Sequence, residues 1–356
     1  MRVTTLSLIL SGFAVAAHAT NVVDAVESPV IFVRDASAVA GFDVDATKVR
    51  AMISAGIKSL TGLNYEAAAW RAFASSNDVV GIKINVQAGP LQVTRPALVA
   101  AIADGLRLAG VATTNIIVWD RDAGKMRVAG YEVGAAVRGG SAPSTIAAGT
   151  AATTPPFRVQ GVVPNGWDAN AFYENKLVGT LIWGDLSFGK EGTGLSTRSH
   201  FPKVLTQTIT KLINVPVLLD HDGCGLAGCL YNVSLGAMDN TRRFETLGQR
   251  GDPYIGEICK LPAIRDKLVL NVMDGLIGGY AGGPAFKPQY SWNCGALYLS
   301  RDPVAVDAVC LQLLEAKRRE AKIPAIGSSA GHITTAARLG LGQSETNKIE
   351  VVEVKP

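Results

Sequence analysis

Two short apolar segments separated by one helix-length segment constrain the fold of this chain more than any other feature. Residues 79–85 and 115–119 are apolar runs of strand length, and Pro96 opens a segment that Gly110 closes. Proline suits the first turn of a helix, and glycine suits the position just after the last turn. Strand, helix and strand in this order are typical of a parallel sheet with crossover helices.

The same alternation continues along the chain. Further strands are predicted at 30–33, 180–183, 211–219, 268–273 and 349–354, and further helices at 46–60, 66–74, 203–209, 303–321 and 332–339. The 38 glycines and the low aromatic content of 6% suit the tight turns between strands and helices of such a protein. We therefore predict an α/β fold with an open, mostly parallel, doubly wound sheet and inserted excursions.

The N-terminus carries the pattern of a secretory signal peptide. Arg2 supplies a short positive region, residues 3–16 are apolar, and residues 17–19 form a small-x-small cleavage site. The apolar stretch is shorter than the roughly 20 residues that a membrane-spanning helix needs. The leader contains no cysteine near the cleavage site, so a lipid anchor is not expected, and it contains no arginine pair, which favours the general secretory route. We predict that residues 1–19 are removed and that the mature protein is periplasmic or secreted, without a membrane anchor.

Residues 20–356 are expected to form a single domain. The segment 135–156 is rich in Ala, Gly, Ser, Thr and Pro, so it is either a surface excursion or a joint between two lobes. The formal net charge is +4 and the charges are interspersed, without the basic stripe or reading motif of a nucleic-acid-binding protein. The expected partner is therefore a small molecule or a metal ion.

Polar residues follow four of the predicted strands. They are Lys83 and Asn85, then Asp120 and Arg121, then Asp220, His221 and Asp222, and finally Asp274. Open parallel sheets bind ligands beyond the carboxyl ends of their strands. Loops also begin there, so each residue taken alone could be an ordinary loop residue. The agreement among four strand ends predicts a polar cleft suited to a metal ion or an anion.

The segment 220–225 contains the most reactive combination of side chains. His221 and Cys224 could supply imidazole and thiolate to a divalent metal ion. A carboxylate beside His221, from Asp220 or Asp222, could also hold the imidazole tautomer for general base catalysis. The alternative for Cys224 is a disulfide with Cys229, and the sequence leaves both readings open.

Two further features bear on cofactors and disulfides. The run 223–228 matches the dinucleotide-binding pattern G-x-G-x-x-G, but the polar segment 239–250 stands where its second strand should be, so NAD is not expected. All five cysteines lie in the C-terminal half, where at most two disulfides are possible.

The glycine-rich segment 275–284 is expected to be either a flexible loop that approaches a ligand or a structural excursion.

Several segments resemble the domain of unknown function 362 family. They include VGIKIN at 80–85, NIIVWDR at 115–121 and SRDPVAVD at 300–307, together with residues 69–71, 194–196, 213–217, 220–221, 232–236, 273–275 and 282–284. These segments span nearly the whole mature chain. The resemblance implies an α/β domain whose shared core includes the strand end at Lys83 and Asn85 and the loop at Asp220 and His221. It implies no settled activity.

The chain also departs from this family in specific ways. Many relatives carry an added iron–sulfur ferredoxin segment, and this chain lacks the clustered cysteines that such a segment needs. An iron–sulfur cluster is therefore not expected. Relatives often have lysine at the positions of Leu219 and Tyr231, and histidine at the position of Glu245.

The first functional hypothesis is a metal-assisted enzyme that acts on a small oxygen-rich molecule. His221 and Cys224 would bind the metal, and Asp220 or Asp222 would orient them. Lys83 would anchor an anionic group of the substrate. Asp120 or Asp274 would act as an acid, a base or a further ligand.

The second hypothesis is an exported binding protein without catalytic turnover. It would bind a metal ion or a small anion at the same strand ends. The ligand contacts would come from Lys83, Asn85, Arg121 and Asn232.

Overall fold

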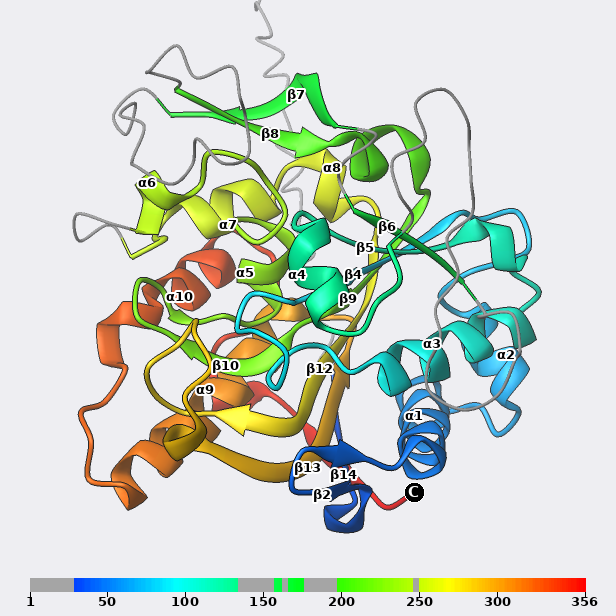
Figure 1. Ribbon diagram of the computed structural model, residues 1–356, viewed down its shortest axis with the longest axis horizontal. Helices are drawn as coiled ribbons and strands as arrows, with labels where there is room; N and C mark the ends of the chain where they lie inside the picture. Colours follow the sequence, from blue (N-terminus) through cyan, green and yellow to red (C-terminus); the bar gives the residue numbers. More distant parts are fainter. Residues whose placement is uncertain (1–28, 134–156, 162–165, 176–196, 246–249) are drawn as a thin grey trace, which may run out of the picture.

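A computed structural model describes residues 29–133, 157–161, 166–175, 197–245 and 250–356 (Figure 1). The predicted signal peptide, the segment 135–156 and the predicted strand at 180–183 lie outside the described residues. None of the helices in the described ranges is both long enough and apolar enough to cross a membrane.

A ten-stranded sheet forms the centre of the molecule. Its strands follow the order β14 (Val351–Val354), β1 (Val30–Arg34), β13 (Ser291–Ser300), β12 (Leu268–Gly279), β9 (Lys211–Val215), β4 (Val80–Ile84), β5 (Ile116–Asp120) and β6 (Arg158–Gly161). Strand β10 (Val217–His221) pairs with β12, and β11 (Gly225–Leu226) pairs with β10. Along the main order every pair is parallel except the two pairs of β13. The predicted mostly parallel sheet is confirmed.

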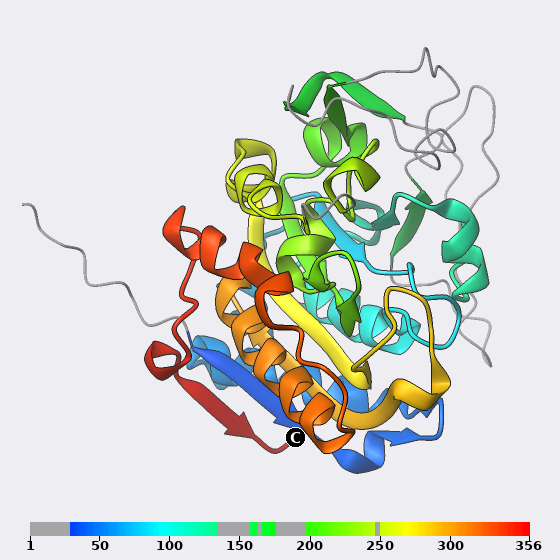
Figure 2. The same cartoon turned by 90° about the vertical axis from the view of Figure 1, so that its left-hand side faces the viewer.

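Helices cover both faces of this sheet, as predicted (Figures 1 and 2). One face carries α1 (Ala46–Thr61), α2 (Glu66–Arg71) and α3 (Pro96–Leu108), which form one hydrophobic core with the strands. The other face carries α5 (Cys229–Val233), α7 (Tyr254–Cys259), α8 (Pro262–Arg265), α9 (Pro303–Glu320) and α10 (Gly331–Arg338), which form a second core.

Smaller elements complete the described chain. They are β2 (Val39–Ala40), β3 (Asp43–Val44), α4 (Ala123–Val128), β7 (Trp167–Glu174), β8 (Arg198–Pro202) and α6 (Arg242–Glu245), with the short helices η1 (Ala36–Ala38), η2 (Thr113–Asn115), η6 (Pro288–Tyr290), η7 (Gly327–Ala330) and η8 (Thr346–Lys348). Strands β7 and β8 pair with each other outside the main sheet.

The helix boundaries follow the local signals in the sequence. The Asp45 carboxylate accepts hydrogen bonds from the first backbone N–H groups of α1, and Gly62 closes that helix with a positive φ of 68°. Pro96 opens α3, as predicted. The Asp302 carboxylate caps α9 by accepting bonds from the N–H groups of Val304 and Ala305.

Three predicted elements differ in the structure. The strand expected at 211–219 is split at Pro216 into β9 and β10, because proline has no N–H to donate to a sheet. The helix expected at 203–209 is a single π-helical turn, η5 (Val204–Thr208). Residues 275–279 of the glycine-rich segment, expected to be a flexible loop or a structural excursion, belong to β12, which pairs with β13 over this stretch.

Candidate functional site

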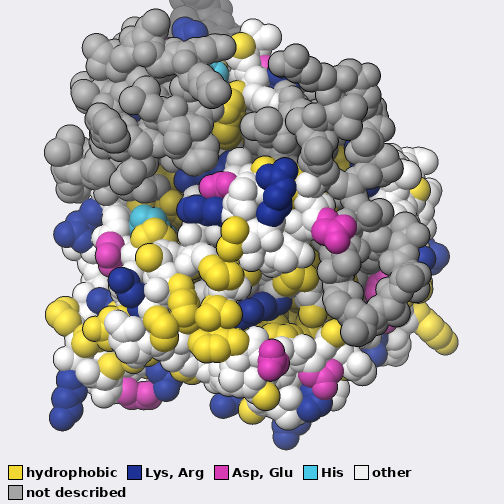
Figure 3. Space-filling model, viewed as in Figure 1, with side chains coloured by type: hydrophobic (Ala, Val, Ile, Leu, Met, Phe, Trp, Pro, Cys, Tyr) yellow, Lys and Arg dark blue, Asp and Glu magenta, His cyan; other side chains and the backbone are white. Residues whose placement is uncertain are grey.

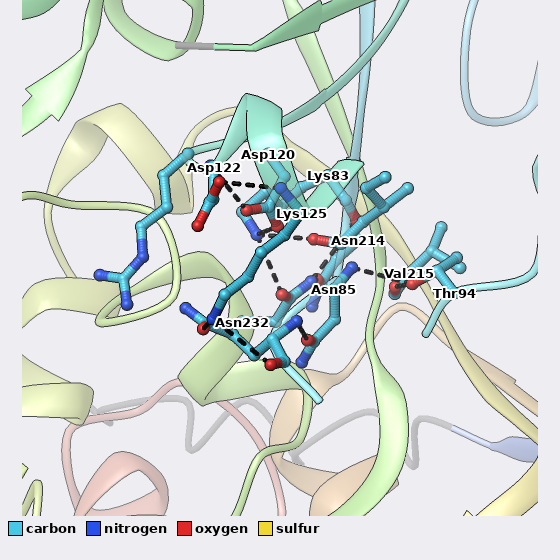
Figure 4. A network of polar contacts seen from close by, with 12 residues as sticks. Lys83, Asn85, Thr94, Asp120, Asp122, Lys125, Asn214, Val215 and Asn232 are labelled. Carbon is cyan, nitrogen blue, oxygen red and sulfur yellow. Dashed lines mark hydrogen bonds and ion pairs between the residues drawn. The ribbon is translucent and has the colours of Figure 1, made fainter. Parts of the chain in front are cut away.

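The ammonium group of Lys83 contacts residues of β4, β5 and α5 at the carboxyl edge of the sheet (Figure 4). Its Nζ donates hydrogen bonds to Asp120 Oδ2 at 2.8 Å, to Asn232 Oδ1 at 3.0 Å and to the Ile84 carbonyl at 2.6 Å. The side chains of Lys83 and Asp120 are each only 1% exposed. The structure therefore brings together Lys83, Asp120 and Asn232, which were predicted from separate parts of the sequence.

Strand pairing explains why the first two residues meet. Strands β4 and β5 run parallel, and Lys83 lies opposite Trp119, one residue before Asp120. Burial lowers the pKa of Lys83, and the neighbouring Asp120 carboxylate opposes that effect. The three oxygens around Nζ are a carboxylate, an amide and a carbonyl oxygen, the same types that bind hard metal cations. The lysine ammonium thus occupies a position that a bound cation could otherwise take.

A chain of buried asparagines extends this contact across the sheet. The Asn232 amide donates to Asn214 Oδ1 at 2.8 Å, and the Asn214 amide donates to Asn271 Oδ1 at 2.9 Å. Asn214 lies in β9 and Asn271 in β12, and both are fully buried. The sequence analysis missed these two residues, although a polar amide inside an apolar strand must find a partner.

Asn85 and Asp274 hold the loop that follows β4. The backbone N–H of Asn85 donates to Thr94 Oγ1, whose hydroxyl donates to the Val215 carbonyl. The Asp274 carboxylate accepts bonds from the N–H groups of Arg95 and Leu276, at 2.8 and 3.1 Å. Burial raises the pKa of Asp274. Asn85 lies beside the Lys83 contact (Figure 4), and the described bonds of both residues order the loop.

Arg121 and Asp122 have anchoring contacts of their own. One guanidinium nitrogen of Arg121, Nη1, donates to the carbonyls of Leu235 and Met238 and to Thr241 Oγ1, at 2.9 to 3.0 Å. Arg121 therefore ties the end of β5 to the chain that follows α5. The Asp122 carboxylate caps α4.

Charged side chains of both signs gather near α4 on the face shown in Figure 3, and apolar side chains lie below them in that view. Lys125 of α4 extends over the strand ends, where its Nζ donates to Gln87 Oε1 at 2.8 Å (Figure 4). Lys125 is exposed, unlike Lys83. An anion approaching this edge would meet both a surface lysine and a buried one.

Asp220 belongs to a second cluster, which the described hydrogen bonds do not join to the first. Its carboxylate accepts a bond from the Gly283 N–H at 2.9 Å and lies 3.4 Å from Arg318 Nη1. Burial raises the pKa of Asp220 to about 6, and the Gly283 bond and the Arg318 charge oppose the shift. The side chain of the neighbouring Asp222 is exposed.

The ring of His221 is oriented by its own loop. Its Nδ1 lies 3.1 Å from the Gly223 nitrogen and 3.2 Å from the Cys224 nitrogen, and both backbone N–H groups donate to it. A nitrogen that accepts two such bonds carries no proton, so these bonds favour the neutral tautomer with hydrogen on Nε2. A metal ion at Nδ1 would have to displace both bonds.

All five cysteines lie within the described residues and carry thiols rather than disulfides. The disulfide alternative for Cys224 and Cys229 is therefore not formed in this structure. Burial raises the pKa of the thiols of Cys229, Cys259 and Cys310, and that of Cys294 to about 11. Within the described ranges, no three or more His, Cys, Asp or Glu side chains are grouped to hold a metal ion. A metal at His221 and Cys224 stays a prediction.

Helix α5 lies between the two clusters. The Tyr231 ring contacts the His221 ring, with 4.7 Å between centroids, and the next residue, Asn232, contacts Lys83. The helix is held by Asp307 of α9, whose carboxylate accepts bonds from the N–H groups of Cys229 and Leu230 at 2.6 and 2.9 Å. Burial raises the pKa of Asp307 to about 7. Asp307 therefore positions α5 from within the core.

The raised pKa of Asp220 predicts a pH-dependent stability. The carboxyl of Asp220 has a pKa of about 6 in the folded protein and the usual 3.8 in the unfolded chain. Its contribution to the free energy of unfolding is therefore complete below pH 3.8 and is lost as the pH rises through 6. The non-titrating Asp220→Asn variant should therefore gain stability relative to the parent between about pH 4 and 7. Urea unfolding across this range measures the difference. Asp43→Asn, at an exposed position, is the control. The prediction would be contradicted if the free energy of unfolding changed with pH equally in both variants.

Residues 192–312 match the model of the family described as Domain of unknown function (DUF362). No curated protein matches the sequence. A crystal structure of a protein from Thermotoga maritima is similar at 10% sequence identity, with a TM-score of 0.41. That match covers 80% of this chain and 61% of the other, so the chain spans about three fifths of that protein.

The matched segment contains Asp220, His221, all of α5 and Asp307, whereas Arg318 follows it and Lys83, Asn85 and Asp120 precede it. It also agrees with the family resemblance seen in the sequence. Residues 192–312, about a third of the chain, are therefore similar to the DUF362 family.

Proposed function

We propose that this protein binds a small oxygen-rich anion, such as a carboxylate or a phosphate, at the carboxyl edge formed by β4, β5 and α5. The observation that carries the proposal is the buried ammonium of Lys83 among the oxygens of Asp120, Asn232 and Ile84. A ligand oxygen would take the place of one of these three acceptors.

The energetic argument starts from the cost of burying charge. Removing two ions from water costs several kcal/mol per ion, and a buried pair is often no more stabilising than apolar residues of similar volume. The stability of the core therefore does little to explain why Lys83 and Asp120 are buried at this position. Buried ionisable groups with shifted pKa values are typical of sites that bind or transform ligands.

The geometry indicates which contact a ligand would replace. The bond from Lys83 Nζ to Asn232 Oδ1 is the longest of the three, at 3.0 Å, and Asn232 comes from the short helix α5 rather than from the sheet. A ligand oxygen at that position would accept from Lys83, and the anion's charge would also be favoured by Lys125. Asp120 would keep the ammonium protonated and in place.

The binding alternative fits the described contacts better than the metal-assisted one. The cation position beside Asp120 is occupied by Lys83, and Nδ1 of His221 already accepts two backbone bonds. We also propose that the protein is exported by its N-terminal leader, so the ligand would be one available outside the cytoplasm.

Ligand-induced stabilisation tests the proposal. The purified mature protein would be melted with phosphate, sulfate, citrate, glycerate and gluconate, and with glycerol as the neutral control. A binder present at about 100 times its Kd raises the free energy of unfolding by about 2.7 kcal/mol. Affinities for the best anion would then be measured by calorimetry for the parent, Lys83→Met and Lys125→Met.

We expect Lys83→Met to weaken binding by about tenfold or more, because a charge-assisted hydrogen bond is lost. Lys125→Met should weaken it only about two- to threefold, since an exposed charge acts through screened attraction. If Lys83→Met does not fold, Asn232→Asp provides a second variant, because a carboxylate beside Lys83 should repel the anion. Equal losses in the two lysine variants would contradict a specific site.

The same experiment includes Zn²⁺ and Ni²⁺, with metal content measured in protein purified without a metal-binding tag. Stoichiometric metal that is lost in His221→Ala would favour the metal-assisted alternative. Anion binding that is unchanged in His221→Ala and lost in Lys83→Met would favour the proposal.

A further inference from the structure

Two loops lie side by side at the carboxyl edge of the sheet, below α4 in the view of Figure 1. The first, residues 85–95, joins β4 to α3, and the second, residues 280–287, joins β12 to η6. The Phe286 N–H donates to the Ala88 carbonyl at 2.9 Å, which ties the second loop to the first. The surface of both loops therefore borders the strand end that carries Lys83.

Large apolar side chains of these loops are exposed to solvent. Leu91 is 38% exposed, and Phe286 is partly exposed. Phe42, in the turn between β2 and β3, is 39% exposed and meets the Phe286 ring edge-on, with 5.6 Å between centroids. Figure 3 shows apolar side chains over this region, below the charged side chains near α4. We call Phe42, Leu91 and Phe286 the apolar patch, and exposed patches of this kind are typical of binding surfaces.

A lysine ammonium lies at the border of the apolar patch. Lys125 Nζ donates to Gln87 Oε1 at 2.8 Å and lies 3.4 Å from the Gln87 carbonyl oxygen. Gln87 directly precedes Ala88, whose carbonyl accepts the bond from Phe286. Given the reach of one residue, Lys125 Nζ lies within about 11 Å of the Phe286 backbone.

The charge of Lys125 is available to a ligand. Among the described residues both of its acceptors are neutral oxygens of Gln87, so its described contacts include no carboxylate. The same side chain extends over the strand ends, toward the Lys83 contact (Figure 4). An anionic head at these lysines would therefore place a tail attached to it over the apolar patch.

We propose that the ligand of the Lys83 site is amphiphilic, a carboxylate with an unbranched hydrocarbon tail of about eight carbons that covers the apolar patch. The head would lie at Lys83 and Lys125. This inference rests on the function proposed above, because the head is the anion bound there. Three bonds of an extended chain span about 3.5 Å, so about eight carbons reach from Lys125 to Phe286.

Octanoate is the probe. Acetate, which has the head alone, and octanamide, which has the tail without the charge, are the matched controls. Each would be titrated into the ¹³C-methyl-labelled mature protein and followed by NMR. We expect octanoate to bind at least about tenfold more tightly than acetate, because the tail leaves water. It should also shift the Leu91 methyl signals. Octanamide should bind about tenfold more weakly than octanoate, because the charge-assisted bonds to lysine are lost.

Variants of the apolar patch locate the tail. Leu91→Ser and Phe286→Ser should each weaken octanoate binding about three- to tenfold and leave acetate binding unchanged. Tyr65→Ser, at a position that is 83% exposed and lies between α1 and α2, is the control and should change neither. Unchanged octanoate binding in both patch variants would overturn the inference.

Two outcomes separate this inference from the function on which it rests. Equal affinities for acetate and octanoate, with acetate binding lost in Lys83→Met, would overturn the amphiphilic ligand and leave the anion site intact. Octanoate binding that is unchanged in Lys83→Met and matched by octanamide would overturn both proposals, because the tail would then bind without the head.

Discussion

Replacing Lys83 with methionine is expected to lower the free energy of unfolding by about 3–5 kcal/mol, since it leaves the Asp120 carboxylate buried without its cation. The reverse change, Asp120→Leu, should cost a similar amount, because it leaves the ammonium without its counter-ion. Both side chains are 1% exposed, so bulk water does not solvate the charge that remains in the folded variant. Urea or thermal unfolding of the purified variants measures these losses.

The double variant Lys83→Met/Asp120→Leu tests whether the two charges act as a pair. It should be more stable than the sum of the two single losses predicts, because an apolar pair of similar volume leaves no buried charge. The exposed pair of Lys348 and Glu345, with 56% and 58% of the side chains exposed, is the matched control. Removing either control partner should cost less than about 1 kcal/mol. A loss in Lys83→Met no larger than that in Lys348→Met would contradict the buried pair.

Gly228→Ala is expected to destabilise the protein by about 2–4 kcal/mol, through overpacking and the loss of a helix cap. A Cβ atom at Gly228 would lie 2.2 Å from Asp307 Oδ1, and would push away the carboxylate that holds the first N–H groups of α5. The backbone angle of Gly228, with φ of −83°, is accessible to alanine, so the effect is one of space rather than of backbone strain. Chemical unfolding measures the loss.

Two comparisons separate this effect from a general cost of changing glycine. Gly124→Ala in α4 introduces a Cβ that lies 3.3 Å from Asp122 Oδ1, and it should be neutral or stabilising by up to about 1 kcal/mol. In an Asp307→Ala background the Gly228→Ala change should cost little, because the obstructing carboxylate is already gone. If the stability losses of Gly228→Ala and Asp307→Ala simply add in the double variant, Asp307 is not the group that the new Cβ displaces.

Local patterns were sufficient for the core of the fold. The segment from β4 through α3 to β5 was predicted because its strands are continuous apolar runs and its helix begins at Pro96. The extent of β12 was not predictable in this way, since its glycines are typical of a loop. Gly278 lies against the Trp292 ring, and Gly279 lies against the Gln92 amide. These distant neighbours leave no room for a larger side chain in the strand.

The candidate site was predictable only where a strand end marked it. Lys83 and Asp120 were found because polar residues followed apolar runs. The roles of Asn214 and Asn271 depend on the pairing of β9 with β12, and the role of Asp307 depends on a contact across 78 residues. No local pattern contains that information, so the support behind Asn232 became visible only in three dimensions.

The dependence of α5 on Asp307 also sets the order in which the site can be completed. A helix of five residues is far shorter than the roughly 12–15 residues at which isolated helices become even marginally stable in water. Helix α5 therefore gains its cap only after α9 has been synthesised and has docked. Lys83 and Asp120 are made much earlier and can pair as soon as β4 and β5 associate. The ion pair lies in two neighbouring strands, whereas the position of Asn232 depends on a contact with α9, so the last third of the protein completes a site whose charged residues lie in β4 and β5.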